Sequence, residues 1–301
     1  MGFTVLSLFD GISCGQIALE RARIKVDNYY ASEIKPHAIQ TTLLHYPNTI
    51  EIGDVKKISY KDGVLYTEKG NFNVGKIDLL IGGSPCQNFS IARVSSGRTR
   101  DGLEGDKSVL FYEYLRLKEE IQPTYFLLEN VKMKKKDEAE LNKYLGTTGI
   151  HIDSKLVSFQ TRARIYWTNI ENISLPKDKN INFQDYKDTN PDYCKQFKVK
   201  RTPSRERMWN NGKGRENVGN CPNITYATKV GCITRKQDRS PNSGLIEFED
   251  FCRYLTRREI ELAQTLPLGY TDNLTYGQMQ DVCGDGWTVD VIAHIFSFLM
   301  K

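Results

Sequence analysis

From Phe3 to Asn169, short runs of β-branched and other apolar residues alternate with stretches whose apolar positions have helical spacing. This alternation is typical of a sheet whose parallel strands are joined by crossover helices. It predicts an α/β fold with a doubly wound parallel sheet and a small inserted hairpin. The predicted strands are Thr4–Phe9, Tyr29–Ser32, Ile77–Gly82, Tyr125–Leu128, Leu156–Phe159 and Ile165–Thr168, the helices Gly15–Ala22, Pro36–His45, Val109–Glu120 and Asp137–Leu145, and the hairpin Gly63–Val74 with Lys69-Gly70 at its turn.

After Asn172 the chain loses this periodicity until about Gly244 and becomes rich in Lys, Asn, Asp, Pro and Gly. Twelve basic but only three acidic residues lie between Lys195 and Arg239, although the whole chain has a net charge of only +5. Such a local excess indicates a polyanionic partner, and it fits a solvated basic loop equally well. Helical spacing returns after Phe251 and, beyond a loop, over Val289–Leu299.

The composition is that of a globular protein. The chain has 301 residues, of which 39% are hydrophobic and 26% charged, with a mean hydropathy of −0.50, which excludes the disordered and fibrous classes. The apolar stretch Phe3–Phe9 is too short for a signal peptide or a membrane span, so we expect a cytosolic protein without a membrane partner. Seven scattered cysteines without a Cys-x-x-Cys pair predict free thiols, no disulfide framework and no metal site.

Candidate ligand-binding residues follow the first three predicted strands. Phe9–Gly15 combines two glycines with a helix start, a pattern that lets a ligand approach the backbone at the edge of a doubly wound sheet. It lacks the spacing G-x-G-x-x-G, so a nicotinamide dinucleotide is disfavoured. Glu33 and Asp54 follow the next two strands and could accept hydrogen bonds from a ribose and an adenine amino group, although each could equally be a surface acid or a helix cap.

Candidate catalytic residues follow the later strands. Cys86 comes after Gly-Gly-Ser-Pro, which presents a thiol at the same edge of the sheet as a candidate nucleophile, whereas a lone cysteine is more often a small buried hydrophobe. Glu129, flanked by apolar residues at a strand end, is a candidate proton donor. Arg162 and Arg164, two residues apart on one strand, could bind an anion or a base oxygen. The loop Ile91–Lys107 has the composition of a lid.

In chain order, the motifs are FDGISCG, ASEI, GDV, GGSPCQNFS, ENV, QTRAR, LTRREIELAQTLPLGYTD and GDGWTVDV. This series resembles the DNA cytosine-5 methyltransferases, especially the catalytic domains of the de novo type and solitary phage or bacterial relatives. The resemblance implies a Rossmann-like methyltransferase sheet in residues 1–174 and a small irregular target-recognition region in residues 175–250. Residues 251–301 would then return to complete the catalytic domain.

The resemblance also implies S-adenosylmethionine as the cofactor, with no metal. Ser13-Cys14 stands where the family usually has more glycine, which leaves the contacts around the methionine part of the cofactor open, and Asp285 stands where many relatives carry Asn. The residues expected to line the cofactor pocket are Phe9, Asp10, Gly11, Ile12, Ser13, Cys14, Glu33, Ile34, Asp54, Val55, Gly82, Pro85, Leu110, Gly286 and Trp287.

By the same resemblance, the Cys86 thiolate adds to carbon 6 of cytosine while Glu129 holds or donates a proton at ring nitrogen 3. Carbon 5 then takes the methyl group, and loss of its proton expels Cys86. Arg164 would bind the ring oxygen and Arg162 would support it together with the neighbouring phosphate. Asn130 would anchor the turn that carries Glu129.

These atoms are inaccessible inside a duplex, so the target nucleotide must be flipped out. The resemblance places the loop Ser90–Lys107 and the basic region on the DNA, with Gly231–Thr234 as a short Thr-containing recognition element. We expect a monomeric, stand-alone modifier of double-stranded DNA in the cytosol of a bacterium or phage host. The residues expected to contact DNA are Ser90, Arg201, Arg205, Thr234, Arg235 and Lys236.

Three alternatives remain at this point. A transfer-RNA cytosine methyltransferase uses a very similar site, but the basic region favours DNA. A DNA-binding homologue without catalysis is disfavoured because Cys86, Glu129 and Arg164 occur together. An enzyme acting on free cytidine monophosphate would not need the basic region.

Overall fold

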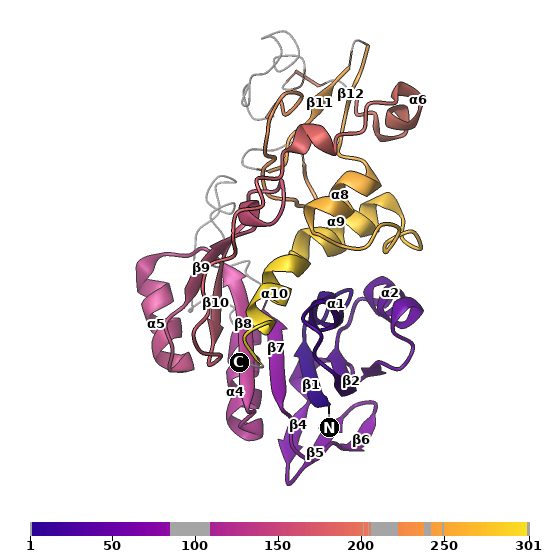
Figure 1. Ribbon diagram of the computed structural model, residues 1–301. Helices are drawn as coiled ribbons and strands as arrows, with labels where there is room; N and C mark the ends of the chain where they lie inside the picture. The colour runs from indigo at the N-terminus through magenta and orange to yellow at the C-terminus, as the bar shows by residue number, and fades with distance from the viewer. Residues whose placement is uncertain are drawn as a thin grey trace. The chain divides into compact units, whose positions relative to one another are not determined.

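The structure is a computed structural model that describes residues 2–84, 109–200, 202–203, 205, 222–237, 242–248 and 250–299. It comprises two compact units (Figure 1). The first consists of Met1–Ile152, Ala163–Leu175 and Val289–Lys301, and the second of Asp153–Arg162 and Pro176–Thr288. Four of the expected site residues, Pro85, Cys86, Ser90 and Arg201, and the expected lid Ile91–Lys107 lie outside the described residues.

The first unit is built on a seven-stranded sheet in the order β3-β2-β1-β7-β8-β10-β9. β1 lies at the point where the strand order reverses, and it pairs in parallel with both β2 and β7. β7 pairs in parallel with β8, whereas β10 runs antiparallel to β8. The predicted doubly wound α/β fold is therefore confirmed. The strands are β1 (Phe3–Leu8), β2 (Val26–Ser32), β3 (Ile50–Glu51), β7 (Leu79–Gly83), β8 (Tyr125–Val131), β9 (Ile150–Asp153) and β10 (Ala163–Thr168).

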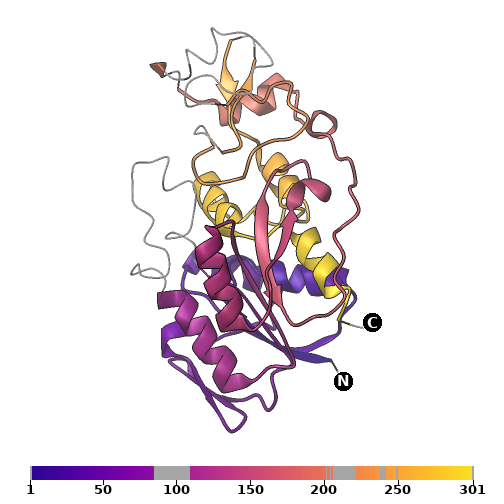
Figure 2. The ribbon, with the colours of Figure 1, turned by 90° about the vertical axis from the view of Figure 1, so that its left-hand side faces the viewer.

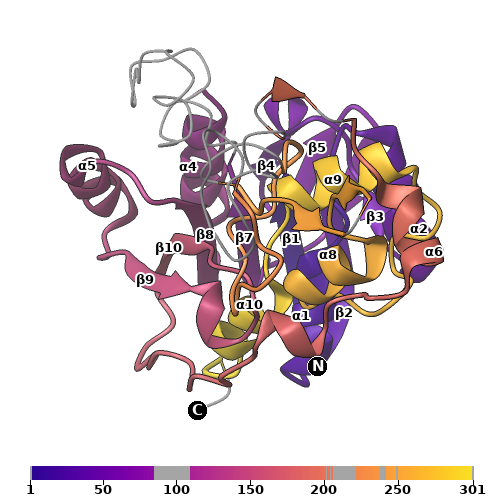
Figure 3. The ribbon, with the colours of Figure 1, turned by 90° about the horizontal axis from the view of Figure 1, so that it is seen from above.

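Helices cover both faces of this sheet, which explains why its central strands are continuous apolar runs. α4 (Val109–Ile121) and α5 (Lys135–Leu145) pack on one face and bury a core shared with β1, β7 and β8. α1 (Cys14–Arg21) and α10 (Val289–Phe296) lie side by side on the opposite face (Figures 2 and 3). α2 (Pro36–His45) begins with a proline, which suits the first turn of a helix.

The predicted hairpin is confirmed. β5 (Val64–Thr67) pairs antiparallel with β6 (Gly70–Asn73), and β4 (Ser59–Lys61) extends the hairpin into a three-stranded sheet. Leu65, on β5, is fully buried in the core beneath α4. The small sheet is therefore part of the first unit and not a separate module.

The predicted strand Leu156–Phe159 is wrong. Its first residue closes a 3₁₀ turn, Ser154–Leu156, while the strand of this region, β9, lies earlier at Ile150–Asp153. The Asp153 carboxylate accepts a hydrogen bond from the backbone N–H of Lys155 at 3.0 Å and so bends the chain at the end of β9. Apolar content alone does not distinguish such a turn from a strand.

The described part of the second unit contains little regular structure. Its elements are α6 (Pro191–Cys194), α8 (Arg257–Ala263), α9 (Tyr276–Asp285), β11 (Ile246–Glu247) and β12 (Cys252–Arg253). α8 and α9 each begin with a capping box, formed by Thr256 with Glu259 and by Thr275 with Gln278. α9 lies where the sequence predicted a loop, and it forms because this cap precedes a buried apolar face that includes Met279.

Of the C-terminal segment 251–301, Val289–Lys301 belongs to the first unit and the preceding part to the second. Within the second unit, Arg253 and Glu259 form a fully buried ion pair with nitrogen–oxygen distances of 2.7 and 2.9 Å. Both partners also bond to the backbone of Asp188. Arg253 donates to the Asp188 carbonyl at 2.7 Å, and Glu259 accepts from the Asp188 N–H at 2.8 Å. These bonds join α8 to the irregular segment before it. No helix in the described residues is long and apolar enough to cross a membrane.

Replacing Glu259 with Ala leaves the Arg253 guanidinium buried without its counter-ion. We therefore expect the free energy of unfolding to fall by about 3–5 kcal/mol, measured by urea denaturation. Asp192→Ala removes the exposed partner of Lys195 in the same unit and should leave the free energy of unfolding essentially unchanged. Equal losses in the two variants would show that the buried pair does not join this unit together.

Candidate active site

The loop after β1 makes a tight turn. Phe9, Gly11 and Ser13 all have left-handed backbone conformations, with φ of 58°, 64° and 55°. A Cβ on Gly11 would meet nothing within 4 Å, so the backbone there faces open space. This geometry leaves room for a ligand against the main chain at the carboxyl end of β1.

Glu33 is held in place at the carboxyl end of β2. Its Oε2 accepts a hydrogen bond from the N–H of Gly11 at 2.8 Å, and its Oε1 accepts from the N–H groups of Ile34 and Lys35 at 2.8 and 2.9 Å. The next side chain, Ile34, is 69% exposed, which is unusual for a large apolar residue. Gly11 after β1 and Glu33 after β2, both expected at the cofactor, are thus linked by a direct hydrogen bond.

Asp54 follows β3, the neighbour of β2 in the sheet, and caps a 3₁₀ turn (Val55–Lys57) through a hydrogen bond from the N–H of Lys56 at 3.0 Å. Val55 is buried in the core. Because the carboxyl ends of parallel strands meet at one edge, Asp54, Glu33 and the Gly11 loop line the same edge of the sheet.

Asp10 lies inside this loop. Its Oδ1 accepts a hydrogen bond from the Tyr29 hydroxyl at 2.7 Å, and its Oδ2 accepts from the hydroxyl of the fully buried Ser13. Burial raises the pKa of Asp10, although these hydrogen bonds partly oppose the shift. Ile12 and Cys14, also expected at the cofactor, are buried.

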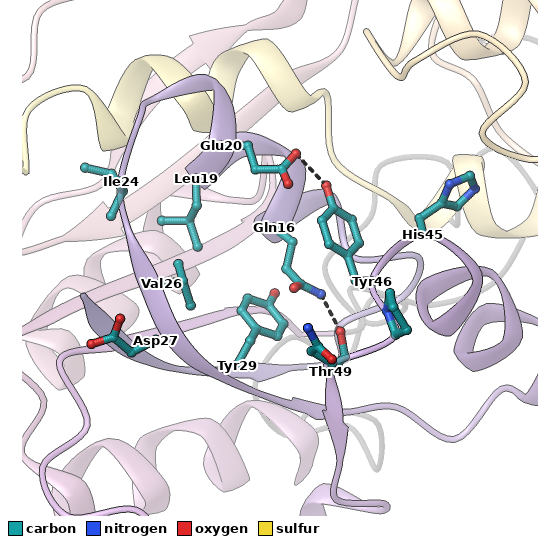
Figure 4. A pocket seen from close by; sticks show the side chains of 12 residues that line it. Gln16, Leu19, Glu20, Ile24, Val26, Asp27, Tyr29, His45, Tyr46 and Thr49 are labelled. Carbon is teal, nitrogen blue, oxygen red and sulfur yellow. Dashed lines mark hydrogen bonds between the residues drawn. The ribbon is translucent and has the colours of Figure 1, made fainter. Parts of the chain in front are cut away.

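A pocket of about 410 Å³ lies behind this loop, between α1, β2 and residues 45–49 (Figure 4). Two of its lining residues bond to the loop, since Tyr29 donates to Asp10 and Gln16 donates to the Ser13 hydroxyl at 3.0 Å. None of the residues expected at the cofactor lines this pocket. The lining residues Tyr29 and Gln16 therefore support the loop after β1, and the pocket itself is separate from the expected cofactor residues.

On the other side of the strand reversal, β7 is closely packed at Gly82, one residue before the strand ends. A Cβ on Gly82 would lie 3.0 Å from the ring of Tyr114 and 3.2 Å from the carbonyl oxygen of Leu8, so a larger residue would displace α4 or β1. Beyond it, the Asn130 amide donates to the Ser84 hydroxyl at 3.1 Å. Asn130 thus joins the end of β8 to Ser84, which follows β7 and stands two residues before Cys86 in the sequence.

Glu129 is paired with Arg164 at this edge of the sheet. The Arg164 Nε lies 2.9 Å from Glu129 Oε1, and Glu129 is only 7% exposed. Glu129 pairs with Gly83 across β7 and β8, and with Tyr166 across β8 and β10. The pair therefore lies beside the chain segment that leads to Cys86. A guanidinium at this distance orients the carboxylate.

Arg162 has a different environment from Arg164. It precedes β10 and belongs to the second unit, where it is only 3% exposed. Its guanidinium donates to the carbonyl oxygens of Ile233, Gly284 and Gly286 at 3.2, 3.0 and 2.8 Å. In the described residues, Arg162 thus joins the expected recognition element to the segment that ends α9.

The sequence did not indicate that Gln160 also holds the expected recognition element, through Ile233. Its side-chain oxygen accepts from the Ile233 N–H at 2.8 Å, and its amide donates to the carbonyl oxygen of Ala263 at 2.9 Å. Gln160 is fully buried. Its spacing of two from Arg162 was the available signal, because alternate residues of an extended segment point to the same side.

A second buried glutamine fixes the other end of this segment. The Gln237 side chain accepts from the N–H of Leu255 at 2.9 Å and donates to the Tyr276 hydroxyl at 3.0 Å. Between Ile233 and Gln237, the side chains of Arg235 and Lys236 are exposed and Thr234 is half-buried. We call residues 233–237 the anchored segment, since side chains hold both of its ends.

Comparison with known proteins identifies the family. A model described as "C-5 cytosine-specific DNA methylase" matches residues 3–301. The chain belongs to this family. It is 35% identical over 130 residues to the orphan methyltransferase M.Rho11sI of Bacillus phage rho11s, and 36% identical over 129 residues to the DNA (cytosine-5)-methyltransferase DRM2 of Oryza sativa. These matches cover 42% and 41% of this chain but only 23% and 20% of those proteins.

Solved structures support the fold of this family member. The Dnmt2 methyltransferase of S. pombe superposes with a TM-score of 0.69 at 17% sequence identity, covering 99% of this chain and 98% of the other. The Entamoeba histolytica methyltransferase EhMeth gives a TM-score of 0.70 at 16% identity, covering 100% and 98%. The Rossmann-like methyltransferase architecture is thereby confirmed.

The remaining expected site residues of this methylase-family chain are spread over both units. Leu110, on α4, is half-buried against the core of the first unit, whereas Gly286 and Trp287 belong to the second. Arg205, expected on DNA, donates to the Tyr254 hydroxyl at 3.1 Å and to the carbonyl oxygen of Lys200. Among the described residues, no group of three or more His, Cys, Asp or Glu is arranged to hold a metal ion.

The contacts of Arg162 generate a prediction. A lysine at this position cannot reach three separate carbonyls, so we expect Arg162→Lys to lower the free energy of unfolding by about 1–3 kcal/mol. Amide hydrogen exchange around Ile233 and at the end of α9 should also become faster. Arg164→Lys is the matched control, whose pair lies in the first unit, and it should leave exchange in the second unit unchanged. Unchanged stability and exchange in Arg162→Lys, with methyl transfer lost, would instead assign Arg162 to the substrate.

Proposed function

We propose that this chain is an S-adenosylmethionine-dependent DNA (cytosine-5)-methyltransferase. The observation that carries the proposal is the Glu129–Arg164 pair at the edge of the sheet, beside the strand that leads to Cys86, in a chain of the C-5 cytosine-specific DNA methylase family. The matched segments span less than a quarter of the length of these curated relatives.

The crevice at the ends of β1, β2 and β3 fits the proposed cofactor. The open space at Gly11 admits the methionine part against the backbone, and the carboxylate of Glu33 is already oriented to accept hydrogen bonds from ribose hydroxyls. Asp54 would accept from the adenine amino group, and the exposed Ile34 would pack on the purine ring. When bound, the cofactor supplies an electrophilic methyl group.

The chain's own residues would activate the base. The Cys86 thiolate forms a bond to carbon 6 of cytosine, and Glu129 holds a proton at ring nitrogen 3, so the electron pair displaced from the ring moves to carbon 5. Arg164 orients Glu129 and hydrogen-bonds the ring oxygen. After methylation a base removes the carbon 5 proton, the carbon 5–carbon 6 double bond re-forms, and Cys86 leaves as the thiolate.

We infer double-stranded DNA as the partner and a monomeric enzyme. The anchored segment supports DNA because its backbone is held at Ile233 and Gln237 while Arg235 and Lys236 remain exposed. A fixed backbone with exposed cations suits contact with phosphates and base edges at low conformational cost. The target base would be extruded for reaction.

Cys86→Ser should abolish methyl transfer, because a hydroxyl is far less nucleophilic than a thiolate at neutral pH. Labelled S-adenosylmethionine offered to duplex DNA, transfer RNA and cytidine monophosphate measures activity and substrate together, and we expect label only in DNA. Cys194→Ser, at a buried thiol with no proposed role, is the control. Duplex DNA containing 5-fluorocytosine should become covalently attached to the wild type and not to Cys86→Ser; attachment to both would exclude Cys86 as the nucleophile.

The double variant Arg235→Ala/Lys236→Ala should weaken DNA binding. If both side chains contact phosphates, the slope of log Kd against log salt concentration should fall by about 2. Fluorescence anisotropy with a labelled duplex measures both quantities. Lys69→Ala/Lys76→Ala removes two exposed lysines of the first unit as the matched control. An equal salt dependence in both double variants would exclude the anchored segment from the DNA contact.

A further inference from the structure

One acidic side chain beside the crevice has no role in the proposed chemistry. Glu51 lies on β3, three residues before Asp54, and both oxygens of its carboxyl are shielded from solvent. Neither oxygen has a hydrogen-bond partner among the described residues. A buried carboxylate without a partner is costly, so the neutral acid is the favoured form.

The strand register places Glu51 on the face of the sheet that carries the crevice loop. Its neighbours Ile50 and Ile52 pack into the core beneath α4, so Glu51 points to the opposite face. There it pairs with Ala31 of β2, which in turn pairs with Ser7 of β1. Ser7 is also a hydrogen-bond partner of Asp10.

Two further carboxyl groups act on Glu51, and both belong to the crevice. These are Asp10, bonded to Tyr29 and Ser13, and Glu33, bonded to the Gly11 loop. Burial, together with repulsion from Asp10 and Glu33, raises the pKa of Glu51 to about 8. No basic group contributes to it among the described residues. The other titratable groups of this cluster are Tyr29 on β2 and Cys14 on α1.

We propose that Glu51 senses the charge of the methyl donor: its carboxyl is neutral in the empty protein and releases its proton to solvent when the cationic donor occupies the crevice. The inference rests on the proposed function. S-adenosylmethionine carries a sulfonium cation that the product, a neutral thioether, lacks. A cation brought close to buried acids favours their ionised forms. The ionised cluster therefore favours the donor over the product, so product release accompanies the return of the proton.

Isothermal titration calorimetry at pH 7 in two buffers of different ionisation enthalpy counts the released protons. Glu51 should be about 90% protonated in the empty protein at this pH, so the wild type should release about 0.9 proton more than Glu51→Gln when the donor binds. This difference should vanish when the product, S-adenosylhomocysteine, binds. Glu119→Gln, at an exposed acid on α4, should behave as the wild type.

Donor affinity should follow the same linkage. Because the ionised form of Glu51 binds the cation better, the donor Kd of the wild type relative to that of Glu51→Gln should fall about tenfold between pH 7 and pH 9. The amino group of the donor titrates in this range as well, and taking the ratio between variants cancels it. Equal proton release by the wild type and Glu51→Gln would overturn the inference, while donor binding itself would leave the proposed function intact. Absence of donor binding to the wild type would overturn both.

A measurement on the wild type alone guards against misfolding of the variant. Infrared difference spectroscopy should show loss of a protonated-carboxyl C=O band when the donor binds and no such loss with the product. The same band change with both ligands, or with neither, would contradict the proposal.

Discussion

The approach of β7 to its neighbours is the constraint on which the rest of the first unit depends. β7 is paired on both sides, and at Gly82 it passes so close to Tyr114 and Leu8 that a side chain there would require these neighbours to shift by a few tenths of an ångström. This close pairing brings the ends of β1, β7 and β8 to one edge. The loop after β1, the segment that leads to Cys86, and Glu129 all lie at that edge, and the hydrogen bond from Asn130 to Ser84 links the ends of β8 and β7 there.

The sequence predicted the elements of the first unit well because their signals are local. Apolar runs, a proline at the start of α2 and glycines after strands report on neighbouring residues only, and the family motifs placed Glu33, Glu129 and Arg164 at strand ends. The prediction of Leu156–Phe159 as a strand failed because the Asp153 cap stabilises a turn at Ser154–Leu156, whereas the apolar residues alone favoured a strand.

The second unit was less predictable because side chains distant in sequence hold it together. The carbonyl contacts of Arg162 and of Arg253 and the hydrogen bonds of the two buried glutamines span long stretches of chain. The partners in these hydrogen bonds do not recur at a regular spacing along the chain, so no sequence pattern predicts them. Charge alone also did not indicate that Arg205 donates hydrogen bonds to a tyrosine hydroxyl and a carbonyl oxygen, and its contact with DNA stays a prediction.

The anchored segment depends on its two ends and not on its exposed side chains. Gln160 bonds the backbone N–H of Ile233, and Arg162 bonds its carbonyl, so both contacts are blind to side-chain identity. Gln237 closes the other end. None of these anchoring contacts uses the side chains of residues 234–236, so substitutions there can change the surface that the segment presents while its two attachment points stay in place.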